Sequence, residues 1–330
     1  METEKNPCID ITLEQTCDFL KSRNDFVILC HASPDGDTIG SAAGLCLILR
    51  RLGKRAFILC GDPFPEKFTY IYKGLTQQDL QEAFIPQTVV ASDVADPKLL
   101  GRLREEYPSV DLCIDHHVSN TRYAHRLLLD SSASAACEII FQLGRRLADP
   151  ADKQTADALF TGLSTDTGCF KFSNVTARTH RIAADLLELG ADAAEINRLM
   201  FDTKSRQRVE IERMALDSMR FYHEGRCAMT AITKAMREQS RCAEDDLEGL
   251  TTLSRTIEGV VIGVTIREKD NGRYKVSVRT LAPVDASKLC GELGGGGHAR
   301  AAGCELEGPL EQVRETLAEI CLRYLEAVSK

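Results

Sequence analysis

The first half of the chain alternates short apolar segments with longer segments of helical pattern. Four apolar runs have the length of strands, at residues 26–31, 55–60, 88–94 and 111–115. Residues 38–52 predict a helix that Asp37 opens and Gly53 ends. This alternation is typical of β-α-β units, which build a parallel sheet between helices. We therefore expect an α/β domain over residues 1–200, with a mostly parallel sheet flanked by helices.

The second half of the chain has a different pattern. Residues 201–224 are rich in long charged side chains and predict a helical linker. Strand-like segments follow, and the turn sequence Lys269-Asp270-Asn271-Gly272 between two of them is a strong hairpin signal. The sequence therefore predicts a smaller α/β domain with a mixed sheet over residues 225–330.

Composition and charge narrow the class of protein. No apolar run is long enough to span a membrane, and the polar N-terminus has no signal-peptide core. The 13 cysteines include no C-x-x-C pair, which argues against structural zinc and against a disulfide framework. The net charge of −8 argues against a protein that coats long nucleic acid. We expect a cytoplasmic protein with no membrane partner.

Acidic and histidine residues gather where the predicted strands end. The segment from His31 to Asp37 follows the first strand, Asp93 lies at the end of a later one, and Asp115-His116-His117 ends the next. Asp166 follows an apolar helix. Carboxylates brought into one crevice repel each other unless cations neutralise them. A mixed set of imidazoles and carboxylates suits Mn²⁺, with magnesium, iron, cobalt or zinc as competitors.

These motifs, in this order, resemble the DHH family of phosphoesterases over roughly residues 26–174. The resemblance implies two Mn²⁺ ions per active site. It also implies that Asp93 bridges the ions, that His117 faces the scissile phosphate, and that Asp115 orients the histidines, so these three are the expected catalytic residues. The expected metal ligands are His31, Asp35, Asp37, Asp93, His116 and Asp166.

A second resemblance lies in the C-terminal part. The segment Gly294-Gly295-Gly296-Gly297-His298 with Ala301-Ala302-Gly303 is similar to the first subtype of the DHH-associated domain. Glycines leave backbone amides uncovered, so they can form an anion nest. Arg279 resembles the substrate-binding arginine of that domain. The expected substrate-binding residues are therefore His117, Arg279, Gly295, Gly296, Gly297 and His298.

The two-domain layout resembles the group of bifunctional nanoRNases and pAp phosphatases. That resemblance implies hydrolysis of oligoribonucleotides of 2–5 nucleotides and of adenosine 3′,5′-bisphosphate (pAp) in a cleft between the domains. A phosphodiesterase for cyclic di-AMP or linear pApA shares the same motifs and stays open as the alternative. An inorganic pyrophosphatase or a non-catalytic nucleotide-binding protein fits the motifs less well. The sequence leaves the oligomeric state open, a homodimer included.

Overall fold

The computed structural model describes residues 8–147, 152–247 and 249–327 and forms two compact units. The first unit spans Met1–Thr203 and the second Lys204–Lys330. The first seven residues, which the sequence assigns to the first domain, lie outside the described residues. In the part that is described, no helix has the length and apolar character needed to cross a membrane.

The first unit is built on a six-stranded parallel sheet, as the alternating pattern predicts. Its strand order is β1-β6-β5-β4-β2-β3, and every pairing is parallel. The inner strand β2 is buried along its whole length, which explains its continuous apolar run. The strands are β1 (Ile9–Asp10), β2 (Phe26–Cys30), β3 (Ala56–Cys60), β4 (Thr88–Ser92), β5 (Leu112–Asp115) and β6 (Arg126–Leu129).

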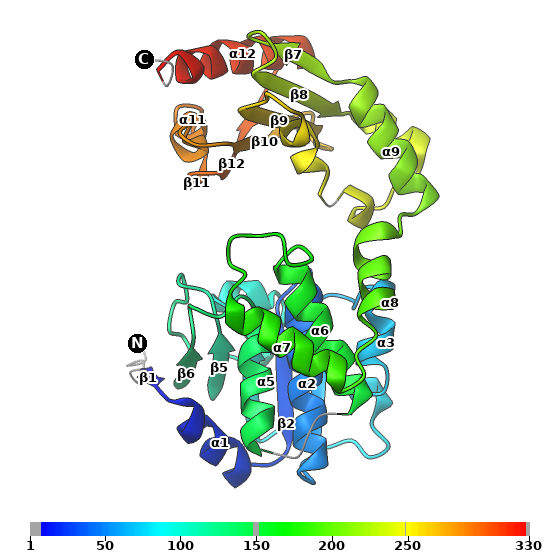
Figure 1. Ribbon diagram of the computed structural model, residues 1–330, viewed down its shortest axis with the longest axis vertical. Helices are drawn as coiled ribbons and strands as arrows, with labels where there is room; N and C mark the ends of the chain where they lie inside the picture. The colour runs from blue at the N-terminus through cyan, green and yellow to red at the C-terminus, as the bar shows by residue number, and fades with distance from the viewer. Residues whose placement is uncertain (1–7, 148–151, 248, 328–330) are drawn as a thin grey trace. The chain divides into compact units, whose positions relative to one another are not determined.

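Helices pack on this sheet from both faces. The larger core joins one face of β2, through Phe26 and Ile28, to residues of α2, α5, α6 and α7, and Figure 1 shows these helices together in front of the strand. A smaller core joins the other face, through Val27 and Leu29, to the short helices near Leu100. The main helices are α1 (Leu13–Ser22), α2 (Gly36–Arg51), α5 (Ala136–Leu147), α6 (Lys153–Asp166) and α7 (Ala177–Glu188).

The second unit has a mixed six-stranded sheet with the order β11-β12-β10-β9-β8-β7. Only β8 and β9 run parallel, and the predicted turn at 269–272 joins the antiparallel pair β9 and β10. The strands are β7 (Arg220–Tyr222), β8 (Cys227–Ile232), β9 (Ile262–Glu268), β10 (Tyr274–Thr280), β11 (Gly296–His298) and β12 (Ala301–Leu306). The helices α11 (Ala286–Gly291) and α12 (Leu310–Ala327) bury one face of this sheet.

The range that we predicted as a helical linker, 201–224, holds elements of the second unit. Helix α9 (Arg206–Asp217) buries Ile211 and Met214 in a core with Ile232 of β8. Strand β7 pairs with β8 as the edge of the second sheet. The second unit therefore starts at Lys204, before residue 225, because the apolar side of α9 packs on this sheet. Before it come α8 (Ala193–Asn197) and a π-helical turn over Arg198–Asp202.

Candidate metal centre

The predicted ligands lie at the carboxyl edge of the first sheet. His31 follows the last residue of β2, Asp93 follows β4, and His116 follows β5. Parallel strands all end at the same edge of a sheet, so residues far apart in sequence meet there. Asp35 and Asp37 lie at the start of α2, and Asp166 is the last residue of α6.

One group of side chains contains His31, Asp35 and Asp93. The His31 Nε2 atom lies 3.6 Å from Asp35 Oδ1 and 3.8 Å from Asp93 Oδ2. The Nδ1 atom of the same ring lies 2.8 Å from the carbonyl oxygen of Ala32. A carbonyl can only accept, so Nδ1 carries a proton, and Nε2 is the ring atom that faces the two carboxylates and would bind a cation once it has lost its own proton.

A second group contains Asp37, His116 and Asp166. The His116 Nε2 atom lies 3.8 Å from Asp37 Oδ2 and 3.6 Å from Asp166 Oδ2. Its Nδ1 atom faces the carbonyl oxygen of Ala133 at 3.3 Å, so this ring is oriented in the same way as His31. Asp37 is fixed by the first amides of α5, since it accepts hydrogen bonds from Ala136 N at 2.6 Å and Cys137 N at 3.0 Å.

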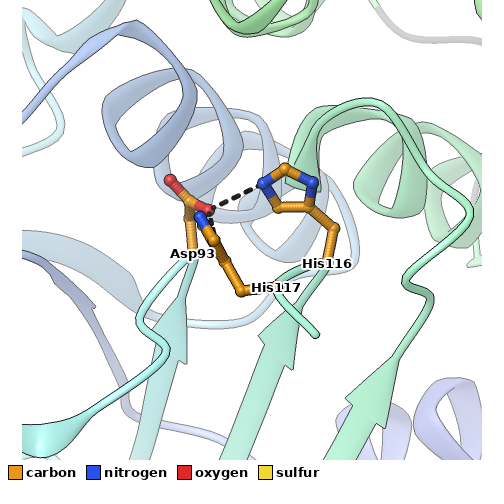
Figure 2. A group of neighbouring side chains, drawn as sticks. All are labelled: Asp93, His116 and His117. Carbon is orange, nitrogen blue, oxygen red and sulfur yellow. Dashed lines mark ion pairs between the residues drawn. The ribbon is translucent and has the colours of Figure 1, made fainter. Parts of the chain in front are cut away.

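Asp93 belongs to both sides of the cluster. Its Oδ2 atom faces His31, while its Oδ1 atom lies 3.4 Å from His116 Nε2 and 3.4 Å from His117 Nδ1. Figure 2 shows the carboxylate of Asp93 pointing at both imidazoles from the end of its strand. Asp93 has a left-handed backbone conformation, with φ of 61°, which turns its side chain into the cluster.

Asp115 lies behind the two histidines and is fully buried. Its Oδ1 atom accepts hydrogen bonds from the backbone amides of His116 and His117 and lies 2.8 Å from His117 Nδ1. Its Oδ2 atom accepts from Asn120 Nδ2 at 2.6 Å. Asp115 therefore holds the backbone of both histidines and the ring of His117 in place. Sequence reasoning missed Asn120, although its place three residues after His117 was the available signal.

The carboxylates of this cluster repel one another in the absence of a cation. Burial, with the charge of Asp37, holds the pKa of Asp93 well above its usual range and raises the pKa of Asp166 to about 7. Among the described residues, Asp93 Oδ1 and His116 Nε2 are buried atoms without a hydrogen-bond partner. Acceptor atoms of this kind are costly to bury alone. The donor set fits divalent cations, which would neutralise the carboxylates and use the orphaned atoms.

Cation binding is expected to displace protons from the cluster. Burial disfavours the charged form of His31, but the neighbouring carboxylate of Asp35 outweighs it and raises the pKa to about 9. A histidine must be neutral and an aspartate ionised to bind a metal, so His31 and Asp166 each lose their proton. We expect Mn²⁺ affinity to rise from pH 6 to pH 9. Calorimetric titration of EDTA-treated protein in two buffers of different ionisation enthalpy should show proton release at pH 7; equal heats in both buffers would contradict it.

The helix that carries Asp35 begins earlier than the sequence predicts. We expected Asp37 to cap it, but the cap is Asp35, whose Oδ1 atom accepts hydrogen bonds from the amides of Asp37 and Thr38. Asp37 is inside the first turn and uses its carboxylate on the start of α5. That contact joins residues about 100 positions apart, so no local pattern could predict it.

The glycine segment of the second unit, which we expected to form an anion nest, is partly a strand. Gly296–His298 form the short edge strand β11, which pairs with β12. The amide of Gly295 already donates to the carbonyl of Cys290 at 2.9 Å, and a Cβ at Gly295 would lie 2.2 Å from Gly303 O. The absence of a side chain at Gly295 therefore lets its backbone pack closely against Gly303. The backbone amides that remain available for a ligand are those on the outer side of the edge strand β11. His298 is exposed and Arg279 is half-buried.

The cluster at the carboxyl edge of a parallel sheet is a candidate metal site, and comparison with known proteins gives the family of the chain. The DHH family N-terminal domain matches residues 25–163, and the DHHA1 domain matches residues 229–325. The bifunctional oligoribonuclease and PAP phosphatase NrnA of Thermus thermophilus is 35% identical over 295 residues, covering 88% of this chain and 87% of that protein. The chain belongs to the DHH family.

Two solved structures share the fold. An exopolyphosphatase-related protein from Bacteroides fragilis has a TM-score of 0.84 at 24% identity, covering 96% of this chain and 97% of that chain. RecJ from Thermus thermophilus, solved in complex with Mn²⁺, has a TM-score of 0.51 at 14% identity and covers 93% of this chain and 54% of that chain. These likenesses support the α/β architecture with its second mixed sheet.

Proposed function

We propose that this chain is a manganese-dependent phosphoesterase that hydrolyses short oligoribonucleotides and adenosine 3′,5′-bisphosphate. The observation that carries the proposal is the position of Asp93, whose two oxygens face two separate groups of ligands. A shared carboxylate of this kind would suit a pair of divalent cations, which many phosphoesterases use. The similarity to the oligoribonuclease and PAP phosphatase of Thermus thermophilus supports the choice of substrates.

Each cluster residue has a distinct task in this proposal. His31, Asp35 and Asp93 would hold one cation, while Asp37, His116, Asp166 and Asp93 would hold the other. Bound cations of this class activate water as a nucleophile and neutralise charge on the phosphoryl oxygens. Asp115 fixes the ring of His117 through Nδ1 and raises the pKa of that imidazole, which leaves the half-exposed Nε2 able to donate to a phosphoryl oxygen.

In the second unit, Arg279, Gly296, Gly297 and His298 bind the remainder of the substrate in this proposal. Arg279 and His298 are each paired with Ala301 in neighbouring strands, so their side chains share one face of the sheet. A guanidinium grips a phosphate through two hydrogen bonds, and an imidazole beside it adds a donor. We also place the protein in the cytosol, because all of its cysteines are free thiols.

A parallel product assay tests the proposed function. EDTA-treated protein is restored with Mn²⁺ and offered pAp, linear pApA, cyclic di-AMP and pyrophosphate. We expect both pAp and pApA to be hydrolysed with a higher kcat/KM than cyclic di-AMP and pyrophosphate, with loss of turnover when the cation is removed; hydrolysis of pApA without pAp would favour the alternative phosphodiesterase. A highest kcat/KM for cyclic di-AMP would favour the alternative phosphodiesterase, and turnover that survives chelation would contradict the metal-dependent mechanism.

A further inference from the structure

A row of paired residues crosses the second sheet at Arg279. His298 of β11 pairs with Ala301 of β12, Ala301 pairs with Arg279 of β10, and Arg279 pairs with Gly263 of β9. Residues paired directly across a sheet place their side chains on the same face. This face is opposite to the one that buries Val276 and Val278 against α11 and α12. The row therefore presents two polar side chains with small residues beside them.

The helical turn η6 (Leu250–Thr256) brings a second arginine to this row. Ser254 anchors η6 to the sheet, since its Oγ atom donates to Val264 O at 3.1 Å. A Cβ at Gly263 would lie 2.7 Å from Arg255 N and 3.0 Å from Arg255 Cα. The absent side chain of Gly263 thus allows the backbone of Arg255 to pack on the strand position that is paired with Arg279.

Neither arginine forms an ion pair with a carboxylate of the residues that the structure describes. Burial, together with the charge of Arg255, lowers the pKa of Arg279. Among the described residues, the guanidinium of Arg279 donates only to the carbonyl of Val278, at 3.1 Å, and the side chain of Arg255 has no hydrogen bond or ion pair. Elsewhere on this sheet, Arg267 pairs with Glu244 and Arg273 with Glu305.

This absence of a counter-ion occurs in a chain with an excess of acidic residues, 49 against 41 basic ones. Two guanidinium groups held together in a partly buried position repel each other unless an anion lies between them. Guanidinium forks match the oxygens of a phosphate, and two forks match the double charge of a terminal phosphate better than the single charge of a diester.

We propose that Arg255 acts with Arg279 to bind a terminal phosphate of the substrate, namely the phosphate that is not cleaved. The identity of that substrate rests on the function proposed above. The proposed function assigns the scissile phosphate to the metal cluster, so the arginine pair takes a phosphate that is not cleaved. Substrates with a free terminal phosphate are selected on this basis over cyclic dinucleotides, in which every phosphate is a diester.

The test compares pAp with adenosine 3′-monophosphate, which carries the scissile group but lacks the 5′-phosphate. In Arg255→Gln we expect KM for pAp to rise about 10- to 100-fold, with kcat nearly unchanged, as the loss of a charged hydrogen bond predicts. KM for the monophosphate should change less than about threefold, because that substrate never occupies the arginine pair. Arg255→Lys should recover part of the pAp affinity, since it restores the charge but not the fork.

Arg267→Gln is the matched control, because Arg267 lies on the same strand as Gly263 but is already paired with Glu244. It should leave both KM values as in the parent. Equal losses for the two substrates in Arg255→Gln, or no loss for either, would overturn the role of Arg255.

A binding measurement separates this inference from the proposed function. Equilibrium dialysis of metal-free protein with pAp and with the monophosphate needs no turnover. If the parent hydrolyses neither compound, the proposed function fails. In that case the phosphate-binding role of the arginine pair is supported only if Arg255→Gln still weakens pAp binding more than monophosphate binding. A parent protein that binds the two compounds equally would refute the pair.

Discussion

Asp93→Asn should abolish turnover, with kcat lowered by at least about 10³-fold. Mutation of a residue that only hydrogen-bonds a metal ligand already lowers metal affinity or activity by about 10- to 100-fold, and Asp93 is itself an expected ligand. Asn is the appropriate replacement, since it tolerates the left-handed backbone of Asp93, with φ of 61°, whereas Ala would add strain there. The variant keeps the shape of the carboxylate but loses the charge shared by the two ligand groups. Steady-state kinetics with pAp and metal analysis after dialysis against Mn²⁺ measure the two losses together.

The same variant also reports on the repulsion inside the cluster. Asp93 has a raised pKa in the folded chain, so its contribution to the free energy of unfolding is lost as the pH rises above the ordinary carboxyl pKa. Asparagine does not titrate. Metal-free Asp93→Asn should therefore lose less stability between pH 5 and pH 8 than the metal-free parent, although it is inactive.

Asp96→Asn is the matched control for this prediction. Asp96 lies three residues further along the same loop, where its side chain caps the turn at Pro97–Leu100. Asparagine caps nearly as well, so turnover and metal content should stay within about twofold of the parent. Activity of Asp93→Asn within tenfold of the parent, or an unchanged gain in Tm on adding Mn²⁺, would contradict the inference that Asp93 is shared by the two groups of ligands.

The elements predicted well are those whose signals are local. Each strand of the first sheet that carries a candidate ligand is a short apolar run, and its ligand comes within a few residues of the end. Parallel pairing then brings His31, Asp93 and His116 to one edge without any further information. The structure places all six expected ligands in groups whose donor atoms lie within 4.8 Å of one another.

The features that sequence reasoning missed depend on contacts between distant residues. The glycine segment has no strand pattern in the sequence, and only its pairing with β12 (Ala301–Leu306) makes it a strand. Arg255 shows no motif of its own, since its place follows from the missing side chain of Gly263. The start of the second unit at Lys204 follows from the packing of Ile211 on β8, which a pattern rich in charged residues obscures.

The close approach of α2 and α6 is another such contact, and it positions the cluster. Gly36, Gly40 and Gly44 recur every four residues along α2, so they form one face of that helix. A Cβ at Gly40 would lie 2.4 Å from the carbonyl oxygen of Ala158 in α6. The first turn of α2 carries Asp37 and the last residue of α6 is Asp166. The separation of the two helices therefore sets how closely these carboxylates meet.

Gly40→Ala is expected to push the two helices apart. A backbone carbonyl cannot rotate away as a side chain can, so we expect a loss of about 2–3 kcal/mol in the free energy of unfolding, even after the better helix propensity of Ala. Displacement of Asp166 relative to Asp37 should lower kcat/KM by about 10- to 100-fold at saturating Mn²⁺. Thermal unfolding of the metal-free protein and steady-state kinetics measure the two effects separately.

Gly44→Ala gives the graded comparison, because it meets the flexible end of Leu159 at 2.5 Å and not a backbone atom. Leu159 can change rotamer, so this variant should lose about 1 kcal/mol or less and keep most of its activity. Equal losses in the two variants would mean that general crowding of the core, and not the helix separation, sets their effect. A Gly40→Ala protein as stable and as active as the parent would show that α6 can shift along α2 without disturbing the carboxylates, and the glycine face would then have no part in building the cation site.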